Sequence, residues 1–137
     1  MTGVLVDTSV GVDHFRHGNV ALEQLLMQDT VLCHPWVLCE IACGTPPVRQ
    51  RTLVDLGALQ MGNTASVQEL MLFVEREHLC GLGCGLVDLA LLASVRITPG
   101  ARLWTLDKRL NALAQRLEVA FANTPHGVGR TGQVLPP

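Results

Sequence analysis

The stretch Gly3-Val4-Leu5-Val6-Asp7-Thr8-Ser9 opens the chain with a short apolar run that halts at a carboxylate. An unbroken run of this length, rich in β-branched residues, is typical of a strand buried on both faces of a parallel sheet. In open α/β sheets, ligands bind in the crevice outside the carboxyl ends of the strands. Asp7 is therefore predicted either to face such a crevice or to cap a following helix, and the stretch alone leaves both interpretations open.

Working outward from this stretch, further short apolar runs alternate with segments of helical periodicity. Strands are expected at 31–33, 102–105 and 119–121, and helices at 10–16, 19–27, 36–43, 49–56, 66–77, 86–95 and 108–117. Strands that alternate with helices predict an α/β fold with a short, mostly parallel sheet flanked by helices. One domain is expected over residues 1–122, followed by a loosely ordered, Gly- and Pro-rich tail at 123–137.

Composition narrows the class of protein. The chain of 137 residues is 48% apolar and only 16% charged, with a mean hydropathy of +0.32, which predicts a core covered on both faces or an apolar association surface. The formal net charge of −2 gives no overall electrostatic case for nucleic-acid binding, so such a role needs a local patch. The long apolar stretch 79–97 carries Asp88 at its middle, which favours a buried helix over a membrane span.

The five cysteines are an odd number, and no secretory signal precedes the first strand. We therefore expect reduced thiols and a cytoplasmic protein. The pairs Cys39/Cys43 and Cys80/Cys84, with His34, admit a zinc site. Their four-residue spacing fits structural zinc sites only loosely, so buried thiols are the preferred interpretation.

Three further acids occupy unusual positions. Glu40 and Asp88 are the only charges in otherwise apolar helical stretches, and Asp107 closely follows the strand expected at 102–105. A carboxylate in apolar surroundings must pair with a cation, bind a metal or become protonated. Pairing with arginine is the structural alternative, although no arginine is close in sequence to Glu40 or Asp88.

A metal site is the interpretation we favour for these acids. Two carboxylates about 4 Å apart repel each other by roughly 4 kcal/mol at an effective dielectric of 20, and a divalent cation removes that repulsion. Oxygen ligands without histidine favour Mg²⁺ or Mn²⁺ over Zn²⁺. Such an ion activates a water and neutralises charge at phosphorus, which points to phosphoester hydrolysis.

Four segments of the chain, in this order, together resemble a known family. They are Val4–Val10, His34-Pro35 through Glu40, Gly81-Leu82-Gly83 through Asp88 with Leu91-Leu92-Ala93, and Leu103–Leu110. From about Val4 to Phe121 the chain resembles a PIN-domain ribonuclease, and specifically a VapC-type toxin of a bacterial type II toxin–antitoxin system.

The resemblance implies a PIN-like domain that cleaves RNA as a Mg²⁺- or Mn²⁺-dependent endoribonuclease, through a carboxylate-held metal and an activated water. It also implies a homodimer and a neutralising antitoxin of the VapB type, with no membrane association. Trp36 and Trp104 are expected in the core or in dimer packing. The catalytic acids that match the family are Asp7, Glu40, Asp88 and Asp107, with Asp7 and Asp88 as metal ligands and Thr8, Ser9 and Thr105 as supporting hydroxyls.

Contacts to RNA phosphates are expected from cations concentrated near Asp107, unless these only form a solvated helix face. They are Arg102, Lys108, Arg109 and Arg116. Leu82 and Leu106 stand where relatives often carry a basic residue, and Leu86 stands where an aromatic residue is common. The alternative function is a catalytically silent PIN-like module whose acidic pocket docks a basic segment of a partner.

Overall fold

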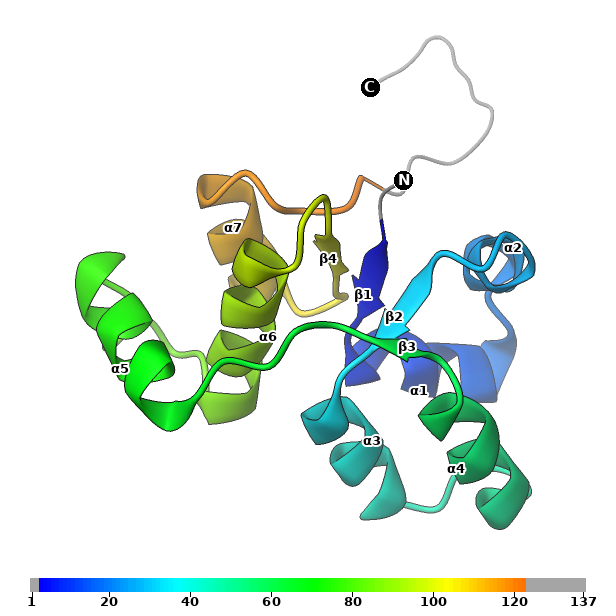
Figure 1. Ribbon diagram of the computed structural model, residues 1–137. Helices are drawn as coiled ribbons and strands as arrows, with labels where there is room; N and C mark the ends of the chain where they lie inside the picture. Colours follow the sequence, from blue (N-terminus) through cyan, green and yellow to red (C-terminus); the bar gives the residue numbers. More distant parts are fainter. Residues whose placement is uncertain (1–2, 123–137) are drawn as a thin grey trace, which may run out of the picture.

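A parallel sheet forms the centre of the molecule in the computed structural model, which describes residues 3–122 (Figure 1). The expected loose tail at 123–137 lies outside the described residues. The strands, in the spatial order β3-β2-β1-β4, are β1 (Val4–Val6), β2 (Val31–Cys33), β3 (Gln60–Met61) and β4 (Arg102–Trp104). All of these strands run parallel, so the predicted α/β class is confirmed.

Helices connect and flank these strands. They are α1 (Thr8–His17), α2 (Val20–Met27), α3 (Pro35–Ala42), α4 (Arg49–Gly57), α5 (Val67–Arg76), α6 (Leu86–Ile97) and α7 (Lys108–Arg116). In Figure 1, α1 to α4 lie on the β2–β3 side of the molecule, whereas α5 to α7 lie on the β4 side. Helix α6 packs on both α5 and β4.

The core lies where the central strands meet α6 and α7. Leu5 pairs in register with Leu103, and both side chains are fully buried together with Leu91, Leu92 and others of α6 and α7. β1 is hydrogen-bonded on both sides, to β2 and β4. Its central position in a parallel sheet explains why its residues form an unbroken apolar run. The carboxyl end of β1, and with it Asp7, is therefore held from two directions.

Local sequence signals account for the helix starts. Asn19 and Ser66 each accept a hydrogen bond at the start of α2 and α5, from Leu22 N at 3.0 Å and Glu69 N at 3.1 Å. The Glu69 carboxylate returns a bond to Ser66 N, which completes a capping box. His34 caps α3 through Nδ1, which accepts from Trp36 N at 3.0 Å.

Two strand predictions need correction. β3 was not predicted, because its two residues form no apolar run and Gln60 is exposed. The strand expected at 119–121 is a single parallel bridge between Leu103 and Ala120. Both lie at the sheet edges, where a neighbouring strand, rather than the local sequence, decides whether the chain pairs.

The tryptophans differ in their surroundings. Trp104 is buried beside Phe121, with ring centroids 5.3 Å apart, as expected for a core residue. Trp36 is 47% exposed, so it is not a core residue of the protomer. In residues 3–122 no helix is long and apolar enough to cross a membrane. The cysteines are free thiols. The expectation that they are buried holds for Cys33 but was wrong for Cys39, Cys43 and Cys80, which are exposed.

Candidate active site

Asp7 is the most firmly held of the four acids. It follows β1 directly and is only 6% exposed. Its Oδ2 accepts hydrogen bonds from Ser9 Oγ and Thr105 Oγ1, each at 2.7 Å. Although Asp7 occupies the N-cap position of α1, its side chain makes no capping bond. The two interpretations left open by the sequence are thereby decided, because the carboxylate faces the carboxyl ends of β1 and β4 and does not cap the helix.

The two hydroxyls are themselves held by the loop after β4. Ser9 Oγ accepts from Leu106 N at 3.0 Å, and Thr105 Oγ1 accepts from Asp107 N at 3.0 Å. Each hydroxyl therefore has its proton free to donate to Asp7. This network joins the ends of two neighbouring strands and fixes the orientation of the Asp7 carboxylate.

Glu40 reaches the same region from α3. Its Oε1 accepts a hydrogen bond of 2.6 Å from Thr8 Oγ1, and Thr8 is the residue next to Asp7. The prediction that Glu40 lies in apolar surroundings was wrong, because its side chain is exposed. Helix α3 buries Val37 and Ile41 and turns Glu40 outward.

Asp88 lies in the first turn of α6 and is partly buried. Burial raises the pKa of its carboxyl, a hydrogen bond from Gly85 N at 3.4 Å lowers it, and the negative charges of Asp7, Asp107 and Glu40 raise it further. The net direction is upward. The direction of this pKa shift is the one expected for a carboxyl that faces other negative charges.

Asp107 caps α7 and is exposed. Its Oδ1 accepts from Leu110 N at 2.9 Å. The other sequence interpretation, pairing of these acids with arginine, is not found, because the ion pairs of residues 3–122 are Asp13–His17, Asp55–Arg51 and Glu77–Arg96. Within residues 3–122, none of the four acids therefore has a basic side chain within ion-pair distance.

This donor set fits a magnesium or manganese ion. Within the described residues, no three His, Cys, Asp or Glu side chains converge closely enough to enclose an ion by themselves. Mg²⁺ does not need such a cage, because it usually keeps several waters and binds through one or two carboxylates. Both hydroxyl bonds to Asp7 end on Oδ2, and no bond from residues 3–122 is directed at Oδ1. Within residues 3–122, the Oδ1 atom of Asp7 is therefore free to bind an ion.

Comparison with known proteins identifies the family of the chain. No protein-family model matches the chain. The chain is 42% identical over 119 residues to Ribonuclease VapC32 in two strains of Mycobacterium tuberculosis, and the match covers 87% of this chain and 96% of the relative. The chain belongs to the VapC family of PIN-domain ribonucleases.

Of the cations expected near the acids of this VapC-family site, Arg109 is the one for which the structure records a contact beside the pocket. Its Nη1 lies 3.5 Å from Gly83 O, on the turn that leads into α6. Burial and the negative charges of Asp88 and Asp107 raise the pKa of the Cys84 thiol, and the positive charge of Arg109 lowers it. Lys108 begins α7 directly after Asp107 and is exposed.

Arg102 and Arg116 are not concentrated near Asp107, as the sequence had suggested. Arg102 begins β4, whereas Asp107 follows the end of that strand, and its guanidinium donates to Glu118 O. Arg116 ends α7, about 12 Å from the capped end at 1.5 Å per residue, and donates to Glu77 O. The correction follows from the direction of the two elements, which carries both arginines away from the acids.

Two features of this VapC-family site were not predicted. The first is Cys84: burial raises the pKa of its thiol, and the negative charges of Asp88 and Asp107 raise it further. Arg109 packs against Gly83, where an added Cβ would lie 2.7 Å from Arg109 Nη1. Neither feature could be seen in the sequence. Arg109 and Gly83 are more than twenty positions apart, and the surroundings of Cys84 depend on the fold of the turn.

Proposed function

We propose that this protein is a toxin endoribonuclease that hydrolyses RNA phosphodiester bonds with Mg²⁺ or Mn²⁺. The observation that carries the proposal is the Asp7 carboxylate, which two hydroxyls hold through one oxygen while the other is directed at no donor of the described chain. The family membership supports the ribonuclease class, because the relative is named a ribonuclease.

Each residue of the pocket has a separate task in this proposal. Asp7 and Asp88 hold the ion, which would lower the pKa of a water and neutralise charge developing on the phosphate. Glu40 and Asp107 complete the anionic pocket, with Glu40 oriented by Thr8. Ser9 and Thr105 keep the Asp7 carboxylate in one orientation, so little reorganisation is needed at the moment of reaction.

The same negative charge suggests how the protein is neutralised. The acids have no arginine or lysine partner within residues 3–122. An antitoxin of the VapB type would cover the pocket and present an arginine to the acids in place of the metal ion. Arginine suits this position because its planar guanidinium binds carboxylates through paired hydrogen bonds.

A homodimer is also part of the proposal. Trp36 at the start of α3 and Leu86 at the start of α6 are 47% and 66% exposed, respectively. Large apolar side chains in such positions are commonly covered at protein interfaces. A Trp36→Glu variant should shift the protein towards monomer in light scattering coupled to gel filtration, whereas an unchanged mass would exclude Trp36 from the interface.

The test of function is cleavage of total RNA by purified, antitoxin-free protein, with Mg²⁺ and with chelator, beside Asp7→Asn. Discrete metal-dependent fragments that the variant does not produce are the expected result. Inactivity of the folded wild-type protein on every RNA would instead favour the binding module. In that case Asp7→Ala should abolish binding of a basic partner segment without changing any hydrolysis.

A further inference from the structure

A hollow of about 470 Å³ runs from the acidic pocket along α1. Its walls come from α1, from α3 and from the loop that follows α3. Its volume falls within the range of ordinary ligand sites. The catalytic acids themselves need no such space, so the hollow calls for an occupant of its own.

One end of the hollow is the catalytic pocket. Thr8 and Glu40 line it there, joined by their 2.6 Å hydrogen bond. Thr8 follows Asp7 in the chain, and the Glu40 charge acts on Asp88. A molecule that contacts Thr8 and Glu40 can therefore extend along the hollow towards Arg16.

The opposite end of the hollow is positive. Along α1 the lining residues are Thr8, Val12, Phe15 and Arg16. They lie on one side of the helix because Val12 is four positions from both Thr8 and Arg16 and three positions from Phe15. Arg16 is about 12 Å along the helix from Thr8, at 1.5 Å per residue. Its side chain is exposed, and no carboxylate of the described chain lies within ion-pair distance of it.

The second wall is a loop with a hydrogen bond near each of its ends. It consists of Gly44–Pro47. Arg49 donates to Ala42 O at 2.7 Å, just before this loop, and Thr52 donates to Pro47 O at its end. Two proline rings and the Phe15 ring give the hollow flat apolar surfaces, on which the face of a nucleobase can stack.

We propose that this hollow is a subsite for a nucleotide flanking the cleaved bond, with its base against Pro46 or Phe15 and its phosphate at Arg16. The inference rests on the proposed function, because it assumes that RNA enters the acidic pocket. RNA fits better than a peptide, since a strand carries phosphates in series. One phosphate would meet the metal at the acids, and the next phosphates would follow the hollow towards Arg16.

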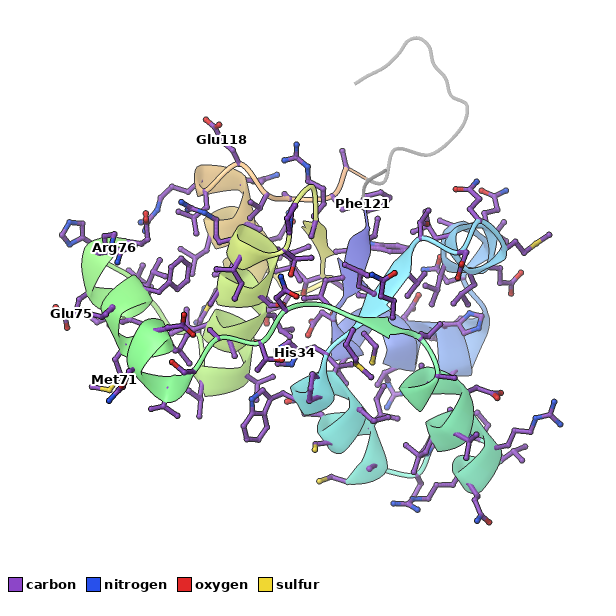
Figure 2. All side chains as sticks on the ribbon, in the orientation of Figure 1. His34, Met71, Glu75, Arg76, Glu118 and Phe121 are labelled. Atoms are coloured by element: carbon purple, nitrogen blue, oxygen red, sulfur yellow. The ribbon has the colours of Figure 1, made fainter. Side chains whose placement is uncertain are left out.

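Two exposed positions allow the proposal to be tested without disturbing the core. Arg16→Gln removes the cation, and Thr45→Trp fills the hollow from its exposed loop. The matched controls are Arg76→Gln on α5, at the far side of the molecule in Figure 2, and Thr64→Trp in another exposed loop. Thermal unfolding of each variant confirms that it folds.

The measurement is cleavage of an RNA library randomised on both sides of the cut, followed by sequencing of the products. Arg16→Gln should lower kcat/KM on the order of tenfold, as expected for one charge-assisted hydrogen bond, and should reduce the salt slope by about one. Thr45→Trp should change base preference on one side of the cut alone. Arg76→Gln and Thr64→Trp should match the wild type.

The outcomes separate this inference from the function on which it rests. A wild-type protein that cleaves no RNA overturns both. If the wild-type protein cleaves RNA and the Arg16→Gln and Thr45→Trp variants keep its rate, salt slope and base preference, the subsite alone is overturned. Variants that cleave normally but escape inhibition by a co-expressed antitoxin would show that the hollow receives a peptide, which also overturns it.

Discussion

Asp7 and Asp88 are the two proposed metal ligands, and the fold holds them in different ways. Asp7 is buried at the end of a central strand, where two hydroxyls bind it at 2.7 Å. Asp88 is partly buried in the first turn of α6, where its recorded contact is the 3.4 Å bond from Gly85 N. One carboxylate is fixed by the sheet, whereas the other is attached to a helix that begins after a glycine-rich turn.

The difference shows how the pocket combines rigidity with charge. The two hydroxyl bonds fix the direction of the Asp7 carboxylate. At Asp88, by contrast, burial and then the neighbouring negative charges raise the pKa of the carboxyl. We therefore expect Asp7 to set the geometry of the site and Asp88 to set how the site responds to pH and to cations.

The largest effect is expected from Asp7→Asn. This change keeps the shape of the side chain but removes the charge of a proposed metal ligand whose orientation is already fixed. A loss of several kcal/mol of transition-state stabilisation corresponds to about a 10³-fold fall in the rate of RNA cleavage. Single-turnover cleavage of a defined RNA measures it. The control is Glu75→Gln on α5, an exposed acid far from the pocket in Figure 2, which should cleave like the wild type.

Removing the support of Asp7 should have a smaller effect than removing Asp7 itself. Thr105→Val deletes the buried hydroxyl that bonds Oδ2, and loss of such an outer contact typically costs 10- to 100-fold in metal affinity or activity. Mn²⁺ titration and cleavage assays measure the two effects. Thr105→Ser, which retains a hydroxyl, should restore most of both. Full activity of Thr105→Val would mean that Asp7 is not held as described.

Much of this fold could be predicted from short-range patterns. The strands β1, β2 and β4 are apolar runs, and the caps Asn19 and Ser66 mark their helices. The two-residue β3 could not be predicted, because its pairing with β2 depends on an edge that exists only in the folded sheet. Propensity is a weak guide for so short a segment.

The candidate site could be predicted in part for a related reason. The acids were singled out as candidates because a charge within an apolar run, as at Glu40 and Asp88, or just after a strand, as at Asp7 and Asp107, is visible in the sequence. Their degree of burial was not, since the outward face of α3 carries Trp36 and Cys39 beside Glu40 and resembles a buried face. The positions of Arg102 and Arg116 depend on which way their elements run, and chain proximity to Asp107 does not reveal it.

The raised pKa of Asp88 predicts a pH-dependent stability in metal-free protein. A folded-state pKa above the unfolded value contributes stability that is fully present below the unfolded pKa and is lost as the pH rises through the folded pKa. Asp88→Asn should therefore melt at a higher temperature than the wild type at neutral pH, and the gain should vanish in acid below the usual aspartate pKa. Calorimetry at pH 7.5 and pH 3 measures this. A gain of the same size at both pH values would contradict the charge argument.

The smallest effect concerns the turn that precedes Asp88. Gly81 and Gly83 have positive φ of 72° and 86°, so alanine at either position should cost about 1 kcal/mol of stability. A Cβ at Gly83 would also meet the Arg109 guanidinium at 2.7 Å, whereas a Cβ at Gly81 meets nothing within 4 Å. The two variants thus share the backbone strain and differ in the contact with Arg109.

If Arg109 positions this turn against the acids, Gly83→Ala should cleave RNA several-fold more slowly than Gly81→Ala at equal stability. The guanidinium is the far end of a flexible side chain and can move, so the rate falls only modestly. Urea denaturation gives the stabilities, and kcat/KM on one defined RNA gives the comparison. Equal rates for the two variants would mean that the turn reaches its position through its own backbone, and that Asp88 is placed by α6 without help from Arg109.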